Sequence, residues 1–261
     1  MTDPNHTPSA DNNAPLHVIL HIPKTSGTTV REFLKPHFQN DQMLLCYDAE
    51  LYRTQAAGIA GLITEKTRVV VGHFHYGLHA HLSRPVQYHT ILRDPLSRLI
   101  SFYEYTKSRD VAVSKEHKLV TAAKTFSVAD FFEMVPEVYN GQCLYLSPDD
   151  PGNVDAALKN LSTMHFGIQH YTAIFIEELA QTFGIRSIVF KNKKVRKTPH
   201  SIPSDALFAL QKKCALDAEL FERATELFLK QRNRTADQLN RLNRNIEKKT
   251  AIRSFLRGLH Q

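Results

Sequence analysis

The chain has 261 residues, which is enough for one sizeable hydrophobic core. Apolar residues make up 42% and charged residues 23%, an ordinary balance for a globular domain, and no apolar run is long enough to span a bilayer. The formal net charge is +7, but residues 230–261 carry nine Lys or Arg and two Asp or Glu, so the preceding part is neutral. A basic face over the whole domain, typical of nucleic-acid-binding proteins, is therefore not expected.

The N-terminal segment and the cysteines bear on location and metal content. Residues 1–15 are polar and lack the basic start and apolar stretch of a signal peptide, so we expect a disordered lead-in. Three scattered cysteines exclude a disulfide framework and a CxxC metal pair, and the fourteen histidines include no HExxH pattern. We therefore expect a protein of the reducing cytoplasm without a metal site.

Short apolar runs alternate with helical segments along the first hundred residues. Strands are predicted over 16–22, 68–73 and 87–92. Helices are predicted over 28–38 and 94–109, the second with Pro95 in its first turn, where a missing N–H costs little. This alternation is typical of a parallel sheet with crossover helices.

The rest of the chain is predicted to be mostly helical. Ser127 is a candidate N-cap and Gly184 a candidate C-cap, and one further strand is predicted over Ser187–Phe190. The predicted helices cover 128–134, 153–164, 171–183 and most of the chain from 204 onward. The fold class is thus α/β: a single domain with a central parallel sheet flanked by helices, plus helical additions.

We expect residues 16–230 to form this domain and residues 231–261 to form a basic, amphipathic helical tail. The tail has apolar residues at broadly helical spacing among basic ones. Two interpretations stay open for it. The helix packs on its own domain, or it contacts a membrane surface or a polyanion.

The segment His21-Ile-Pro-Lys-Thr-Ser-Gly-Thr-Thr29 follows the first predicted strand and opens a helix. A P-loop-like strand-loop-helix of this kind aims backbone N–H groups and a helix N-terminus at one point, which suits an anion. Lys24 adds a positive charge, and the loop's hydroxyl groups add donors. Because Lys24 precedes Gly27 by three residues, the segment is not a Walker A loop.

Two further segments are expected near this loop. Arg93 ends the third predicted strand, at the edge of the sheet where α/β proteins bind ligands. Ser101 lies further along the following helix, and Arg98 is expected to share its face. His73 is the last residue of the second predicted strand and His75 lies two residues further, so they point the same way if that strand continues.

The loop residues HIPKTSGT and the segment Ile91–Tyr103 together resemble the PAPS-dependent sulfotransferases (PAPS is 3′-phosphoadenosine 5′-phosphosulfate). The likeness is to the carbohydrate branch that includes heparan sulfate 2-O-sulfotransferases, in its bacterial type, and it covers residues 16–230. Asn140-Gly-Gln142 and residues 217–224 also resemble that family. Gln169-His170 departs from it, because an acidic residue with Arg or Lys is usual there.

The resemblance implies an enzyme that transfers the sulfuryl group of PAPS to a hydroxyl of an acceptor, with carbohydrate as the expected class. It implies His73 as the catalytic base, with His75 as its rival, and Lys24 as the group that stabilises the developing charge. Arg93 and Ser101 would bind the 3′-phosphate. The basic loop 191–197, which includes Arg196, would close over the nucleotide or hold an acidic acceptor. The implied phosphosulfate-binding residues are Lys24, Thr25, Ser26, Gly27, Thr28 and Thr29.

Two other functions stay open. One is a nucleotide-dependent phosphotransferase on a related fold, although the chain shows neither a Walker A lysine nor an evident acid for Mg²⁺. The other is a non-enzymatic polyanion-binding module that uses the basic tail. The expected partners are PAPS or its product PAP and a hydroxyl acceptor, with no nucleic acid.

Overall fold

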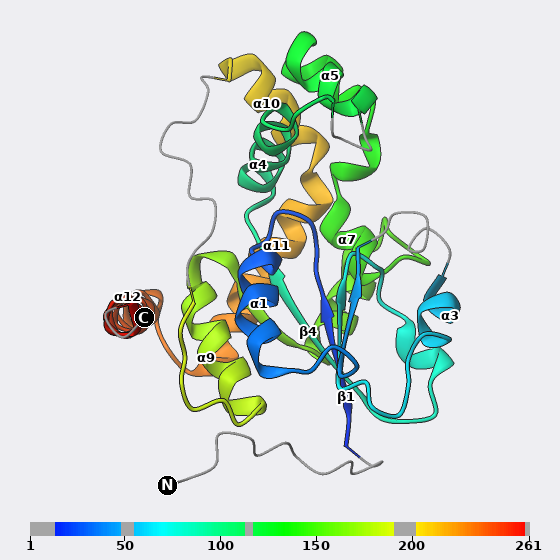
Figure 1. Cartoon of the computed structure of the whole chain (residues 1–261). Coiled ribbons are helices and arrows are strands. Elements are labelled where there is room, and N and C mark those ends of the chain that lie inside the picture. The colour runs from blue at the N-terminus through cyan, green and yellow to red at the C-terminus, as the bar shows by residue number, and fades with distance from the viewer. Residues whose placement is uncertain (1–13, 48–54, 113–116, 191–201, 259–261) are drawn as a thin grey trace, which may run out of the picture.

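The computed structural model describes residues 14–47, 55–112, 117–190 and 202–258 of the chain. Their centre is a five-stranded sheet, all parallel, in the order β2-β3-β1-β4-β5 (Figure 1). The predicted class, α/β with a central parallel sheet flanked by helices, is confirmed. The strands are β1 (Leu16–Leu20), β2 (Met43–Cys46), β3 (Val69–Gly72), β4 (Val86–Leu92) and β5 (His165–Ile168).

Helices cover both faces of the sheet. Along β1 the side chains alternate between the faces: Ile19 joins one apolar cluster, and Val18 and Leu20 join the other. This period of two, with most strand residues buried, is expected for a parallel sheet between helical layers. The first face packs on α1 (Gly27–Leu34) and α9 (Thr172–Thr182). The second packs on α3 (Gln55–Ala60), α7 (Gly141–Leu146), α8 (Val154–Ser162) and α11 (Ala215–Arg232).

A third group of helices stands beyond the carboxyl ends of the strands, where the loop after β1 also turns (Figure 1). Phe131 and Phe132 are fully buried in the separate core of this group. The N-cap predicted at Ser127 is confirmed, because its Oγ accepts a hydrogen bond from the Asp130 N–H at 3.2 Å, and Pro95 begins its helix as predicted. The helices are α4 (Pro95–Lys107), α5 (His117–Thr125), α6 (Val128–Glu133) and α10 (Ser204–Lys213).

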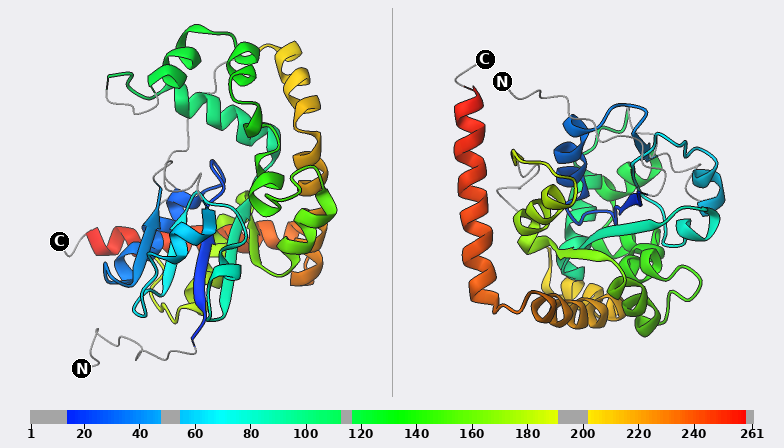
Figure 2. Two further views of the ribbon diagram at one scale, coloured as in Figure 1. Left: turned by 90° about the vertical axis from the view of Figure 1, so that its right-hand side faces the viewer. Right: turned by 90° about the horizontal axis from the view of Figure 1, so that it is seen from below.

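The last helix, α12 (Ala236–Gly258), runs along one side of the molecule (Figure 2). The helix packs against α9 and the turn before it, and four of its side chains are buried: Leu239, Asn243, Ile246 and Thr250. This part of the apolar side of the helix is therefore used within the fold, whereas Ile252 is exposed. No helix in the described part of the chain is long and apolar enough to cross a membrane.

Two predicted elements differ from the structure, and two strands are not predicted. The predicted strand Ser187–Phe190 is wrong: residues 185–190 are irregular, and Ile188 is buried by side-chain packing, while β5 occupies the place beside β4. The helix predicted over 28–38 ends at Leu34 and continues as a 3-10 turn, Lys35–His37, around Pro36, which cannot continue an α-helix. The sequence does not predict strands β2 (MLLC) and β5 (HFGI), because each is only four residues long and, unlike β3 (VVVG), has no run of β-branched residues.

Candidate functional site

The loop after β1 lies where the strand order reverses. The chain passes from β1 to one side of the sheet for β2 and β3, then crosses to the other side of β1 for β4. In open α/β sheets, ligands bind outside the carboxyl ends of the strands at such a point. The loop Pro23–Ser26 after β1 and Arg93 after β4 both lie there, as predicted from the sequence.

The backbone of this loop is strained. Lys24 and Ser26 have φ of 72° and 79°, in the left-handed region that non-glycine residues seldom occupy. The buried Thr25 hydroxyl donates to the Ile22 carbonyl at 2.8 Å, which holds the turn together from within. Strain of this kind costs about 1–3 kcal/mol per residue, and it is maintained where it serves a site.

The turn leaves a row of backbone donors unused. Within the described residues, the N–H groups of Thr25, Ser26, Gly27 and Thr28 have no hydrogen-bond acceptor, and Ser26 gives the helix no side-chain cap. The positive end of the α1 dipole begins at the same place. Such an arrangement can hold a phosphate or sulfate group. The predicted Thr28 is partly exposed, whereas the Thr29 side chain is buried in the first turn of α1.

Gly27 is required here because the ring of His21 lies against it. A Cβ at this position would be 1.9 Å from His21 Cδ2, too close for any real side chain. His21 is buried, and its Nδ1 is 2.8 Å from the Tyr47 hydroxyl. Burial, together with the nearby His73, Arg31 and Lys24, holds the pKa of His21 well below its ordinary value. A neutral His21 thus packs beneath the loop.

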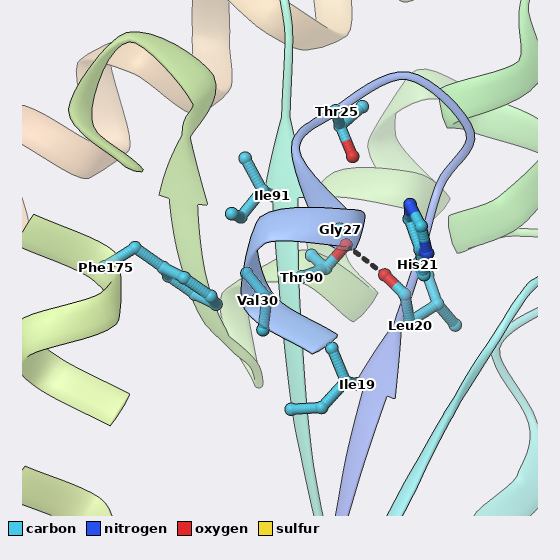
Figure 3. A pocket seen from close by; sticks show the side chains of 9 residues that line it. All are labelled: Ile19, Leu20, His21, Thr25, Gly27, Val30, Thr90, Ile91 and Phe175. Atoms are coloured by element: carbon cyan, nitrogen blue, oxygen red, sulfur yellow. Dashed lines mark hydrogen bonds between the residues drawn. The ribbon is translucent and has the colours of Figure 1, made fainter. Parts of the chain in front are cut away.

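A small pocket lies directly under the loop, between β1, β4 and α1 (Figure 3). Its walls are mostly apolar and include Val30, Ile91 and Phe175. It has room for about one water molecule, so it is not a nucleotide site. The Thr90 hydroxyl donates to the Leu20 carbonyl at 2.9 Å beside it and ties β4 to β1.

Arg93 meets the loop directly. Its guanidinium Nη1 donates to the Lys24 carbonyl at 3.0 Å, so two segments 69 residues apart are joined. Its Nε is buried and has no hydrogen-bond partner among the described residues. Burial lowers the pKa of this guanidinium, because the charged form loses solvation there. A bound anion would stabilise the charged form. Arg93 is therefore a cation beside the unused N–H groups of the loop.

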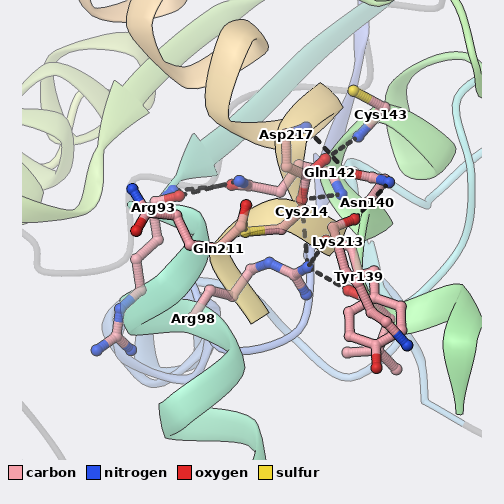
Figure 4. A network of polar contacts seen from close by, with 11 residues as sticks. Arg93, Arg98, Tyr139, Asn140, Gln142, Cys143, Gln211, Lys213, Cys214 and Asp217 are labelled. Atoms are coloured by element: carbon pink, nitrogen blue, oxygen red, sulfur yellow. Dashed lines mark hydrogen bonds and ion pairs between the residues drawn. The ribbon is translucent and has the colours of Figure 1, made fainter. Parts of the chain in front are cut away.

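The backbone of Arg93 is held by a side chain from α7. The Gln142 amide accepts from the Arg93 N–H at 2.9 Å and donates to the Arg93 carbonyl at 2.9 Å (Figure 4). Gln142 is fully buried. The sequence pattern Asn140-Gly-Gln142 pointed to this segment, but not to the two-bond contact with Arg93.

Arg98 makes its contacts in the interior of the protein, with residues of two other helical segments. Its guanidinium is buried and contacts the Val138 and Tyr139 carbonyls, and its Nη2 lies 3.2 Å from Asp217 Oδ2 (Figure 4). A buried guanidinium needs a carboxylate partner, and Asp217 on α11 provides it. Ser101 is partly exposed on α4 and makes no hydrogen bond with the described residues of the loop or with Arg93.

His73 follows β3, next to the loop. Its Nδ1 lies 2.6 Å from the His21 carbonyl oxygen. Because a carbonyl oxygen only accepts, Nδ1 carries the proton, and Nε2 is the basic nitrogen of the neutral ring. The ring centres of His73, His21 and Tyr47 are 4.3–5.5 Å apart, so three residues after neighbouring strands form one aromatic cluster.

His75 has other neighbours. The strand β3 ends at Gly72, so the condition under which the two histidines would point the same way is not met. The His75 ring packs edge-on against Tyr145 of α7, with the centres 4.9 Å apart. Burial lowers the pKa of His75. The two candidate bases therefore have different neighbours: His73 contacts the loop segment, and His75 packs on α7.

Lys24 extends from the loop toward α4. Its ammonium lies 4.0 Å from the centre of the Tyr105 ring, within the range of a cation–π contact. Tyr105 was not predicted as a site residue, and nothing in its local sequence distinguishes it. Arg196 and the basic loop 191–197 lie outside the described residues. Among the described residues, no group of three His, Cys, Asp or Glu could hold a metal ion.

Comparison with known proteins adds little to this geometry. No protein-family model and no curated protein matches the chain. Among solved structures, it is similar to mouse sulfotransferase SULT7A1 complexed with PAP, at 14% identity and a TM-score of 0.40, over 90% of this chain and 89% of that one. Likeness at this level does not by itself assign an activity or a ligand.

Proposed function

We propose that the chain is a sulfotransferase that transfers the sulfuryl group of PAPS to a hydroxyl of an acceptor. The observation that carries the proposal is the contact between Arg93 and the Lys24 carbonyl. It brings together the two segments that resemble PAPS-dependent enzymes, at the point of the sheet where ligands bind. A loop alone suits any anion, whereas a loop with a second cation beside it suits a nucleotide that carries two separate phosphate groups.

The fit of the donor is supported by groups that lack partners. The N–H groups of residues 25–28 are donors without an acceptor among the described residues, and the oxygens of a phosphosulfate group can accept from them. The buried Nε of Arg93 would gain an acceptor from a 3′-phosphate, and Ser101 is the second residue assigned to that phosphate. Arg196 is proposed to close over the nucleotide.

The reaction is an in-line displacement at sulfur. The acceptor oxygen forms a bond to sulfur as the bond from sulfur to the phosphate oxygen breaks, and the proton of the acceptor hydroxyl passes to His73 Nε2. The proposal for His73 is supported by its hydrogen bond to the His21 carbonyl, which orients the ring and sets its tautomer. His75, packed on Tyr145, lacks this support.

Lys24 is proposed to stabilise the negative charge that develops on the leaving phosphate. Its backbone belongs to the strained loop, and its ammonium lies over the Tyr105 ring, so the charge is held close to the loop by a second contact. A positioned cation lowers the barrier because it needs little reorganisation during the reaction.

The proposal extends to the acceptor and the compartment. A carbohydrate hydroxyl is the proposed acceptor, because residues 21–28 resemble the carbohydrate branch. The cytoplasm is the proposed location, which fits three buried cysteines with free thiols.

Thermal unfolding with matched ligands tests the proposal. PAP is expected to raise the melting temperature, and AMP, which lacks the 3′-phosphate, is expected to do so much less. At a PAP concentration about 100 times its dissociation constant, the expected stabilisation is about 2.7 kcal/mol. A response to ATP–Mg²⁺ without one to PAP would favour the phosphotransferase, and a response to an oligonucleotide alone would favour the polyanion-binding module. Either result would contradict the proposal.

A further inference from the structure

Gln142 makes an unusual contact for a buried amide, because it binds both backbone groups of one residue. The two hydrogen bonds with Arg93, at 2.9 Å each, have the pattern of a neighbouring strand. The ladder between β4 and β5 ends at Leu92, which is paired with Ile168. The Gln142 side chain thus provides both backbone hydrogen bonds of Arg93, the residue directly after the last paired residue of β4. It determines the direction in which the Arg93 side chain leaves the strand.

Gln142 is itself held by Asp217, which is fully buried on α11. Asp217 Oδ2 accepts from the Gln142 N–H at 3.0 Å, and Oδ1 accepts from the Cys143 N–H at 2.8 Å. In return, Asn140 Oδ1 accepts from the Asp217 N–H at 3.1 Å. The first turn of α7 and the first turn of α11 are therefore joined in both directions.

Asp217 completes the network with a charge pair. Burial raises the pKa of its carboxyl, and the Arg98 guanidinium at 3.2 Å opposes that rise. Buried polar networks of this kind are costly, and apolar packing of similar volume often stabilises a fold as well or better. The network instead specifies one position for the backbone of Arg93.

We infer that Gln142 is a positioning residue for Arg93 and sets the preference of the site for a nucleotide with a 3′-phosphate, with Asp217 as its anchor. This inference rests on the proposed function. Gln142 is fully buried, so it acts through Arg93 rather than by touching the nucleotide. A displacement of the guanidinium by about 1 Å is enough to weaken a charged contact strongly.

The test compares PAP and AMP binding by calorimetry in the full chain. Gln142→Met keeps the volume but removes both hydrogen bonds. The ratio of PAP to AMP affinity is expected to fall about tenfold, with AMP affinity nearly unchanged. If Gln142 acts only through Arg93, the double variant Gln142→Met/Arg93→Ala will bind PAP no more weakly than Arg93→Ala alone.

A second variant and a control keep the result interpretable. Gln142→Glu keeps the shape and regains the donor when its carboxyl is protonated, so its PAP preference is expected to exceed that of Gln142→Met and to rise as the pH falls. Asn243→Ala removes another buried amide, on α12, and is expected to lower the melting temperature without changing the PAP-to-AMP ratio.

The outcomes separate the two proposals. If the wild-type chain does not prefer PAP to AMP, the proposed function fails. If the wild type prefers PAP and both Gln142 variants keep the same ratio, the positioning role fails while the proposed function stands. Equal losses for PAP and AMP in the Gln142 variants would also overturn it, because they indicate general damage to the site.

Discussion

At the scale of single residues, the orientation of His73 decides what its ring can do. The hydrogen bond from Nδ1 to the His21 carbonyl assigns the proton to Nδ1, which makes Nε2 the nitrogen that can accept a proton. His21 is in turn placed by Gly27, whose missing side chain admits its ring. The candidate base and the loop are therefore linked through one buried histidine.

Replacing the candidate base should affect catalysis rather than binding. His73→Ala is expected to lower kcat by about 100-fold or more, because general-base catalysis is lost, while PAP affinity stays within about twofold of wild type. Steady-state rates with labelled PAPS, and calorimetry with PAP, measure the two quantities. The matched variant His75→Ala should retain most of its activity. Loss of turnover in His75→Ala but not in His73→Ala would exchange the two assignments.

The close approach of His21 to Gly27 predicts a steric effect on the loop. Gly27→Ala would place a Cβ 1.9 Å from His21 Cδ2, so the loop or the ring must move. We expect a loss of stability of about 1–3 kcal/mol and the loss of PAP-induced stabilisation. Denaturant unfolding with and without PAP measures both.

Gly58→Ala provides the control for this variant. Gly58 lies in α3, and nothing is within 4 Å of a Cβ added there. Since alanine restricts the unfolded chain and favours a helix, this change is expected to stabilise the protein by roughly 0.4–1 kcal/mol. Normal PAP binding by Gly27→Ala would show that the contact with His21 does not shape the loop.

At the scale of elements, three neighbouring strands are joined by a row of histidines. His17 Nδ1 lies 3.0 Å from His89 Nε2, and His89 Nδ1 lies 3.0 Å from His165 Nδ1. His165 Nε2 is 2.9 Å from the Glu178 carboxylate, which Arg232 also binds. Because a carboxylate accepts, His165 Nε2 donates to Glu178. When the three rings are neutral, His89 Nδ1 then donates to His165 Nδ1 and His17 Nδ1 donates to His89 Nε2.

This row should make stability depend on pH. Burial, with Arg68 and Arg84 nearby, lowers the pKa of His17 to about 4, and burial with the two neighbouring histidines holds the pKa of His89 well below its ordinary value. An unfolded histidine binds its proton near pH 6.5. Between these values the unfolded chain binds more protons, so stability falls as the pH falls, by roughly 3 kcal/mol for His17 at the acid limit.

Urea unfolding between pH 7 and pH 4 measures this loss. His17→Asn keeps a donor toward His89 but does not titrate, so its free energy of unfolding should fall less steeply over that range. The acidic and basic groups facing the row, Glu178, Arg232, Arg68 and Arg84, are unchanged in this variant. Parallel pH curves for the two proteins would contradict the assignment of the loss to His17.

At the scale of the whole molecule, α12 completes the fold by capping α9. The buried Asn243 Oδ1 accepts from the N–H groups of Ala173 and Ile174, at 3.1 and 3.3 Å. Asn240 Oδ1 lies 2.8 Å from His170 Nε2 in the turn before α9. This supports the interpretation of the tail as a helix packed on its own domain. A contact of its exposed basic side with a polyanion stays a prediction.

Removing the cap should destabilise the molecule as a unit. Asn243→Ala leaves two buried N–H groups without an acceptor, and we expect a loss of about 1–3 kcal/mol in the free energy of unfolding. The exposed Arg244 on the same helix is the control, since Arg244→Gln is expected to change stability by less than about 0.5 kcal/mol. Thermal or urea unfolding distinguishes them. Equal stability of Asn243→Ala and wild type would mean that α12 is not part of the cooperative unit.

The exposed basic side of α12 has a separate test. If it contacts polyanions, replacing Arg241, Arg244 and Lys248 by Gln should reduce retention on a heparin column and its dependence on salt. Stability should be unchanged, because these side chains are exposed. Unaltered retention would exclude this side of the helix as the contact.

Local chemistry explains which parts of this molecule could be predicted. The Val-rich strand β3, the cap at Ser127, the proline that opens α4 and the turn around Gly27 each depend on residues a few positions apart. Their backbone preferences and capping bonds act within that range, so the amino-acid sequence alone determines them. It also determined that Lys24 and Arg93 follow strands that end at one edge of the sheet.

Only the tertiary structure decided which side chains meet there. The sequence does not indicate that Arg98 turns away to Asp217, 119 residues later, or that Gln142 binds the backbone of Arg93, 49 residues earlier. Nor does it distinguish β5 from the apolar run Ser187–Phe190. These outcomes depend on packing and hydrogen bonds between distant segments. A buried polar group that has no hydrogen-bond partner destabilises the fold, so it pairs with whichever group the folded chain brings near it. That partner can lie anywhere in the sequence.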